Sequence, residues 1–283
     1  MNRVNRMKDK VFRIAGLFST LLGIILLLIF VGSILVDGIG RLDLDFMTSL
    51  PSRKAEKAGI LAAWTGTLWM FALTAMISIP IGAAAGVYLE EYGKRNWFSN
   101  LVEVNSSNLA GVPSIIYGIL GLEFFARVAG LGGSLLTGSL TLSLLILPVI
   151  IVATREAVKA VPHTIREAAY GVGATKWQCV SGQVLPAAAG GIVTGVILAL
   201  SRAVGEAAPL IVVGALAYVP FVAKTPMDDY TVLPIQVFNW VSRPEEAFIV
   251  NAAAGIIVLL GITFLLNGLA VFLRYRWQKK VKW

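Results

Sequence analysis

Long runs without a charged residue dominate the chain and predict membrane-spanning helices. Most of them reach or exceed the roughly 20 residues that an α-helix needs to cross a bilayer core. We expect six spans, the fifth of which starts near Val184 and is interrupted by Arg202 and Glu206 before its apolar sequence resumes. The charge-free runs are Ile14–Val36, Ile60–Leu89, Val104–Leu122, Val128–Thr154, Ala207–Ala223 and Ala247–Leu273. The pattern predicts an all-α, polytopic membrane protein.

Composition supports the bilayer as the solvent of this chain. Of its 283 residues, 57% are hydrophobic and only 14% are charged, and the mean hydropathy is +0.79. A soluble domain of this length needs more solvated groups. The first apolar run is longer than the core of a usual signal peptide, and no small-x-small cleavage site follows it. We therefore expect this run to anchor the chain in the membrane.

The distribution of lysine and arginine predicts the orientation in the membrane. If the N-terminus is cytoplasmic, the inner segments hold 16 basic residues and the outer segments hold 7. Both termini are therefore predicted to be cytoplasmic. The net charge of +8 flanks the spans, as anionic lipid and topology demand, so no nucleic-acid partner is expected. The inner segments are 1–13, 90–107, 155–186 and 274–283, and the outer ones are 37–60, 123–135 and 219–249.

The sequence contains no pattern that predicts catalysis, a bound metal or a bound cofactor. The Gly93-Lys94 pair lacks the upstream glycine and the following serine or threonine of a phosphate-binding loop. His163 is the single histidine and Cys179 the single cysteine, which excludes clustered His or Cys ligands and an intrachain disulfide. We expect His163 to lie in solvent or at a helix start, and Cys179 to pack as a small side chain.

A polar island, EAAYGVGATKWQCVSGQVLP at Glu167–Pro186, separates two long apolar stretches. The topology places it in the cytoplasm. A chain that is mostly soluble in lipid has no packing reason to keep such a glycine-punctuated segment. The island therefore indicates a docking site for a partner.

Arg202 and Glu206 are charged residues inside the fifth predicted span, four residues apart and hence on one helix face. A charge at the bilayer centre costs about 2.5–3.5 kcal/mol on insertion scales, which makes such a residue a functional candidate. Pro209 cannot donate to the carbonyl of Gly205, so a break in the helix is expected there. One reading is a mutually neutralising pair that locks two helices together. The other, which we favour, is a gate for an anion, since arginine donors suit a tetrahedral oxyanion.

Small residues recur at helix-packing spacing in the second and fifth spans. Gly82 and Gly86 form one pair, and a ladder of glycine and alanine runs from Gly191 through Gly195 to Ala207. In lipid such residues let two backbones approach closely. The ladders pack either within this chain or against a second membrane subunit.

The polar island resembles the EAA motif of ABC-importer permeases. That motif has Glu-Ala-Ala, three residues, glycine, nine residues and a closing Leu-Pro; Gln183 stands where the family usually has an aliphatic residue. The resemblance implies a short coupling helix that docks into a groove of a separate ATPase subunit. The matching residues are Glu167, Ala168, Ala169, Gly173, Leu185 and Pro186.

Longer segments resemble the PstA-type permease subunits of phosphate importers. They are GTLWMFALTAMISIPIGAAAGVYLEEY (66–92), GVPSIIYGILGL (111–122), SRAVGEAAPLIVVGAL (201–216) and VLPIQVFNW (232–240). Where the family usually reads Gly-Glu-Thr-Ala-Pro, this chain has alanine at position 207. The resemblance implies a type I (MetI-like) permease fold in a bacterial plasma (inner) membrane. Three regions follow: 1–58, with the first span and an outer loop; 59–273, the permease domain with a coupling segment at 155–186; and 274–283, a basic tail.

The same resemblance implies a set of partners. They are a second, PstC-type permease, a PstB-type ATPase dimer that binds ATP and magnesium, and an extracytoplasmic PstS-type binding protein that delivers phosphate. Arg202 and Glu206 then lie on the substrate pathway, and this chain is not itself an enzyme. Two alternatives stay open: a permease for another oxyanion or an amino acid, and a secondary carrier or channel that needs no ATPase.

Overall fold

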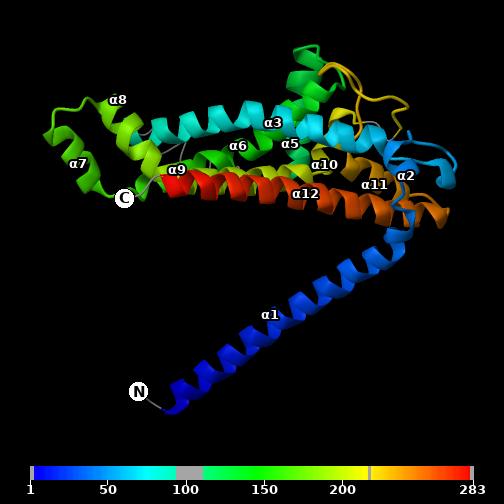
Figure 1. The fold of residues 1–283 in the computed structure, drawn as a ribbon, viewed down its shortest axis with the longest axis horizontal. Helices are drawn as coiled ribbons and strands as arrows, with labels where there is room; N and C mark the ends of the chain where they lie inside the picture. Colours follow the sequence, from blue (N-terminus) through cyan, green and yellow to red (C-terminus); the bar gives the residue numbers. More distant parts are fainter. Residues whose placement is uncertain (1–2, 94–110, 216–217, 281–283) are drawn as a thin grey trace.

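The computed structural model describes residues 3–93, 111–215 and 218–280, and its regular structure is helical (Figure 1). Within these residues five helical stretches are long and apolar enough to cross a bilayer: Lys8–Arg41, Leu61–Tyr92, Leu135–Lys159, Lys176–Val204 and Ala247–Arg276. They correspond to five of the six predicted spans. The first part of the remaining one, 104–122, lies outside the described residues, so the count of six stays a prediction.

The long helices are α1, α3, α6, α9 and α12, and shorter helices and turns connect them. Their bounds are α1 (Arg3–Gly38), α2 (Leu44–Thr48), α3 (Leu61–Val87), α5 (Ser114–Gly121), α6 (Leu135–Lys159), α7 (His163–Gly171), α8 (Lys176–Cys179), α9 (Leu185–Val204), α10 (Ala208–Val213), α11 (Leu233–Val241) and α12 (Ala247–Lys280). The 3₁₀ turns are η1 (Ile39–Arg41) and η2 (Ala55–Lys57), and the π-helical turns are η3 (Tyr88–Tyr92), η4 (Leu122–Val128) and η5 (Val180–Val184).

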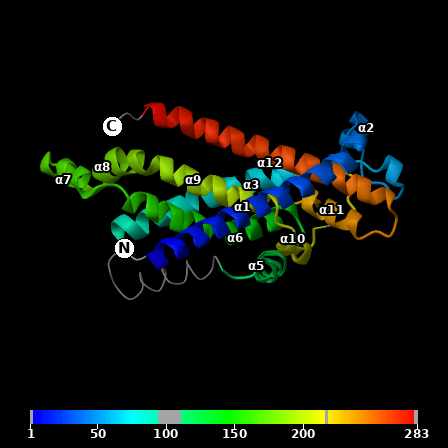
Figure 2. The same cartoon turned by 90° about the horizontal axis from the view of Figure 1, so that it is seen from below.

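The molecule is elongated and its two ends differ. Figures 1 and 2 show α7 and α8 at one end of the bundle, with α2 and α11 at the other. The start of α1 and the end of α12 both point toward the end that carries α7 and α8. Helices α3, α6, α9 and α12 run side by side between the two ends.

Three predicted span limits are wrong. α6 begins at Leu135 rather than near Val128, because Gly130 and Gly132 adopt left-handed conformations (φ +69° and +59°) and Ser134 caps the helix. The fifth span was expected to continue through Ala207–Ala223, but its helix ends at Val213, where Gly214 is left-handed (φ +101°). Its start is earlier than Val184, since α8, η5 and α9 form one continuous helical stretch from Lys176.

Helix α6 lies between α3 and α9, and glycines on both neighbours face it. A Cβ atom at Gly82 would lie 2.7 Å from Ile150 Cγ2, and one at Gly86 would lie 2.6 Å from Thr154 Cβ. On α9, a Cβ at Gly191 would lie 2.7 Å from Ala157 Cβ. Both ladders of small residues therefore pack within this chain, where they bring three backbones close together.

The next contact along α9 belongs to Gly195, where an added Cβ would overlap the Cβ of Ala153. Farther along the same face, Ala199 and Ala203 are buried in the core shared with α3 and α6. One register of α9 against α6 therefore extends over several helical turns.

Several hydroxyl groups buried among these helices donate to a carbonyl of their own helix, whereas the Thr154 hydroxyl on α6 has no hydrogen-bond partner among the described residues. Ser139 donates to the carbonyl of Leu135 (2.8 Å), and Ser143 donates to that of Ser139 (2.7 Å). On α3, Ser78 donates to the carbonyl of Thr74 (2.7 Å). A hydroxyl in lipid needs a partner, and a carbonyl one turn earlier is always within reach.

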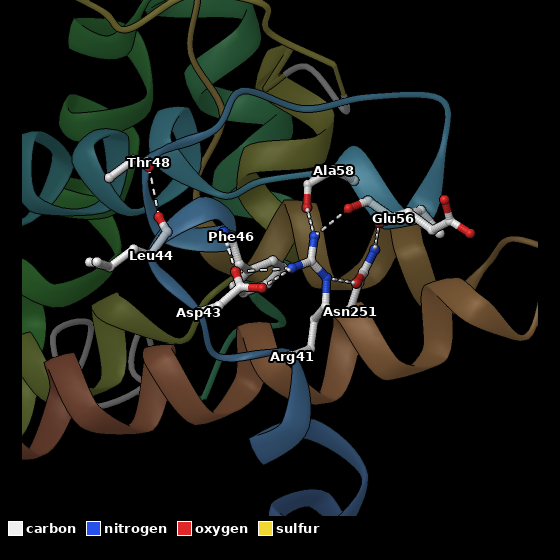
Figure 3. A network of polar contacts seen from close by, with 9 residues as sticks. Arg41, Asp43, Leu44, Phe46, Thr48, Glu56, Ala58 and Asn251 are labelled. Atoms are coloured by element: carbon white, nitrogen blue, oxygen red, sulfur yellow. Dashed lines mark hydrogen bonds and ion pairs between the residues drawn. The ribbon is translucent and has the colours of Figure 1, made fainter.

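The end of α1 is fixed by Arg41, whose guanidinium binds three neighbouring segments (Figure 3). It donates to both carboxylate oxygens of Asp43 (3.0 Å), to the carbonyls of Glu56 (2.8 Å) and Ala58 (3.3 Å), and to Asn251 Oδ1 on α12 (3.3 Å). From this joint α1 diverges from the bundle, and most of its described side chains are exposed (Figure 1).

Gly195→Val should destabilise the chain, because its side chain would overlap α6. Overpacking of this kind costs about 1–3 kcal/mol. Gly261→Val on α12 is the matched control, since nothing lies within 4 Å of a Cβ there. Thermal unfolding of the purified protein in detergent should show a lower midpoint for the first variant only. Equal midpoints would contradict the close contact of α9 with α6.

Candidate functional site

The predicted coupling segment, 155–186, forms the end of α6, all of α7 and α8, and the start of α9. α7 begins after Pro162 and ends at Gly171. The chain then turns through Gly173 into α8, whose N-cap Thr175 forms a reciprocal capping box with Gln178. Helix, turn and helix thus make a compact unit that extends from the bundle (Figure 1).

Gly173 closes α7 with a Schellman motif. Its N–H donates to the carbonyl of Tyr170 (2.9 Å), and the N–H of Ala174 donates to that of Ala169 (3.0 Å). Gly173 is left-handed at φ +84°, a conformation that glycine adopts without strain. No atom lies within 4 Å of where its Cβ would be, so this glycine is required by the backbone rather than by packing.

The EAA residues are divided between the surface and the interior. Glu167 and Ala168 are exposed, whereas Ala169 is buried in an apolar cluster that includes Cys179 of α8 and Val184. That cluster holds α7 against α8 and the first turns of α9. Leu185 and Pro186 are half-buried in the first turn of α9. Partial burial and the neighbouring Cys179 thiol raise the pKa of Tyr170, a further sign of the α7–α8 contact.

Large apolar side chains project from the turn between α7 and α8. Val172 is 86% exposed, Trp177 is 66% exposed and Tyr170 is 44% exposed. With Glu167 and Ala168 they make a mixed apolar and acidic surface at the extremity of the molecule. Such a surface is suited to a protein partner.

Arg166 attaches α7 to the neighbouring helices. Its Nε and Nη2 donate to Glu91 Oε1 at the end of α3 (3.0 and 2.6 Å). Its Nη1 also donates to the carbonyl of Val161 just after α6 (2.7 Å), and its Nη2 donates to the carbonyl of Val158 in the last turn of α6 (3.0 Å). The side chains of Arg166 and Glu91 are only 12% and 8% exposed, so salt screens their pairing weakly.

Two further contacts attach the same end of α3. Arg155 on α6 pairs with Glu90 (3.4 Å), and the Lys176 ammonium of α8 lies 4.7 Å from the centre of the Tyr92 ring. Sequence reasoning missed these partners. The available signal was the adjacent acids Glu90 and Glu91 directly after an apolar span, with Arg155 and Arg166 in the next inner segment.

The register of α9 against α6 sets the depth of Arg202. The helices are antiparallel, so a residue seven positions beyond Gly195 is level with one seven positions before Ala153. This places Arg202 beside Ile146, close to the middle of α6. Arg202 occupies the last turn of α9 rather than the middle of a continuous helix, and its depth in the membrane stays a prediction.

Helix α9 ends at Val204, two residues after Arg202. The N–H groups of Gly205 and Glu206 return to the carbonyls of Arg202 and Ala203 in tight turns (3.3 Å each), and α10 starts at Ala208. The absence of an N–H donor at Pro209, in the first turn of α10, accounts for the interruption. Arg202 Nε donates to Glu206 Oε1 (3.2 Å) across the break, so the pair joins two parts of one chain segment rather than two helices.

Neighbouring helices support the break from one side. A small void of about 10 Å³ lies behind Ala203 and Val204, where Thr67 and Thr74 of α3 also line it. Tyr117 of α5 is buried and lies within electrostatic reach of Arg202. α5 also packs closely on α10, since a Cβ at Gly118 would lie 2.8 Å from Pro209 Cα.

The other side of the pair is open. The side chain of Arg202 is 43% exposed and that of Glu206 is 18% exposed. A charge at mid-depth cannot face hydrocarbon without a large cost, so this face requires water or another protein. Among the described residues no group of three or more His, Cys, Asp or Glu side chains could hold a metal ion.

Comparisons with known proteins identify the family of the chain. The profile of the family described as "Binding-protein-dependent transport system inner membrane component" matches residues 78–279. The phosphate transport system permease protein PstA of Haemophilus influenzae is 30% identical over 263 residues, which span 93% of this chain and 91% of that protein. The probable ABC transporter permease YqgI of Bacillus subtilis is 28% identical, with coverages of 88% and 89%.

A solved structure supports the fold. The crystal structure of a bacterial ABC transporter involved in the import of alginate aligns with a TM-score of 0.65 at 14% identity, over 96% of this chain and 99% of that one. The permease fold and the resemblance to PstA-type subunits are therefore confirmed. The chain is a multi-pass transporter subunit rather than an enzyme, and it belongs to the family of binding-protein-dependent transport system inner-membrane components.

Proposed function

We propose that this chain is the PstA-type permease of an ABC importer that moves inorganic phosphate into the cytoplasm by alternating access. The observation that carries the proposal is a half-exposed arginine at a helix break at mid-depth, in a chain with relatives named as phosphate permeases. The guanidinium of Arg202 offers parallel donors that match a phosphate oxyanion. An entering anion competes with Glu206 for these donors, which makes the pair a gate.

A separate ATPase subunit drives the transport. It docks on the surface of α7 and α8, where Glu167, Ala168 and the apolar side chains of Val172 and Trp177 are exposed. ATP and magnesium bind to that partner, and this chain carries no cofactor. Ala169 and Gly173 act indirectly, because they hold the docking unit in shape.

The remaining partners are those that the resemblance to PstA-type subunits implies. Both termini and the coupling segment lie in the cytoplasm of a bacterium, with the chain in the plasma (inner) membrane. In support, the start of α1 and the end of α12 both point toward the end of the molecule that carries α7 (Figures 1 and 2). A PstC-type permease covers the open face of Arg202. A PstB-type ATPase dimer binds α7 and α8, and a PstS-type phosphate-binding protein approaches the opposite end.

Reconstitution tests the function directly. The chain, a PstC-type permease and the ATPase are placed in liposomes, and phosphate and sulfate uptake are measured with the binding protein, with and without ATP. We expect ATP-dependent uptake of phosphate. Uptake of sulfate or an amino acid instead would assign another cargo, and uptake by this chain alone along a gradient would indicate a secondary carrier.

Arg202→Gln should reduce phosphate uptake by about 10- to 100-fold, the range expected when a charged hydrogen-bond donor is lost. The complex should still assemble, because the side chain is half-exposed. Arg127→Gln is the matched control, since Arg127 also pairs with a glutamate four residues away but lies exposed on η4. Near-normal uptake by the Arg202 variant would refute the anion gate.

Gly173→Ala should weaken ATPase docking about fivefold, because a left-handed alanine costs about 1 kcal/mol. Gly171→Ala is the control: it has the same open surroundings but no positive φ. Retention of the ATPase during purification, titrated against ATPase concentration, measures the effect. If both variants retain the ATPase equally, the turn at Gly173 does not shape the docking surface.

A further inference from the structure

We propose that Glu91 and Arg166 are positioning residues that couple α7 to α3, so that ATPase-driven motion moves α3 and α9 together. We call this ion pair the α3–α7 clamp. The inference rests on the proposed function, since it assumes a moving ATPase on α7. The clamp would be a second mechanical connection between the docking surface and the Arg202–Glu206 gate. The first is the direct chain connection through α9.

The geometry of the clamp is that of a rigid link. All three guanidinium nitrogens of Arg166 donate hydrogen bonds, and their acceptors are Glu91 and the carbonyls of Val158 and Val161. One side chain on α7 therefore holds the end of α3 and the segment that follows α6. Its low exposure removes the water that would otherwise let the pair exchange partners.

The clamp does not act alone at this end of α3. The contact of Lys176 with Tyr92 links α3 to α8, and Tyr92 stacks on Tyr88 within η3 (ring centres 6.3 Å apart). The end of α3 is thus joined to α7 and to α8, which together carry the docking surface. A displacement of that surface pulls on α3 at two points.

At mid-depth the same helix reaches the gate. Thr67, Phe71 and Thr74 of α3 line the void behind Ala203 and Val204, directly before the break that carries Arg202. If α9 moved while α3 stayed, the side chains of α3 and α9 that line this void would separate. Moving α3 with α9 keeps them together.

The test uses the reconstituted complex with Glu91→Gln, Arg166→Gln and the double variant. We expect each to keep the ATPase bound and hydrolysing ATP, while phosphate uptake per ATP falls about tenfold. If the residues act through one contact, the double variant should be no worse than the poorer single variant. Arg166→Lys, which keeps the charge, should restore part of the loss. Glu123→Gln is the control, because Glu123 pairs with Arg127 on exposed η4.

A nitroxide at Met76→Cys, in a Cys179→Ala background, reports α3 without any substrate, because Met76 is exposed midway along that helix. ATP should change its spectrum when Glu91 is present and not in Glu91→Gln. The proposal would be overturned if Glu91→Gln left both the phosphate uptake per ATP and the ATP-dependent spectral change as they are with Glu91. So would a parallel loss of ATPase binding and uptake, which would mean that the pair only keeps α7 folded.

The outcomes also separate the clamp from the proposed function. If the wild-type complex carries no phosphate but ATP still changes the α3 spectrum through Glu91, phosphate is the wrong cargo and the clamp is supported. If the chain binds no ATPase, the proposed function and the clamp are both refuted.

Discussion

The contact of α9 with α6 through glycines is the constraint on which the rest of the structure depends. In lipid, burial from water does not drive helices together, so close backbone approach and dispersion contacts must hold them. Gly191 and Gly195 allow that approach in one register only, because each must face a particular alanine of α6. This register places Arg202 level with Ile146, close to the middle of α6.

Features that depend on local sequence could be predicted. Five of the predicted spans, the break before Pro209 and the turn-forming role of Gly173 each follow from residues within one or two helical turns. The helix limits were less certain, since hydropathy does not distinguish an apolar helix from an apolar loop. Gly130 and Gly132 lie near the start of the charge-free run 128–154, whose helix begins only at Leu135, and the apolar residues described at 218–223 form no helix.

Features that depend on pairing between distant residues could not be predicted. Glu91 and Arg166 are 75 positions apart, and nothing in the spacing of either indicates the other. Their meeting requires the packing of α3 on α6 and the return of the chain through Pro162. The same holds for the ladders of small residues. Their spacing is compatible with contacts inside the chain or with another subunit, and only the position of α6 between α3 and α9 decides for contacts inside the chain.

The position of the break at the end of α9 has a mechanical consequence. The stretch from Lys176 to Val204 is a single helix of 29 residues, about 43 Å long at 1.5 Å per residue. Its first turns belong to the proposed docking surface and its last turn carries Arg202, so the two candidate sites are at opposite ends of one helix. In an uninterrupted helix, both residues of the charged pair would move with that helix. Because α9 stops at Val204, Arg202 belongs to the helix and Glu206 to the chain that follows it, so the proposed gate lies at the point where the two parts can move separately.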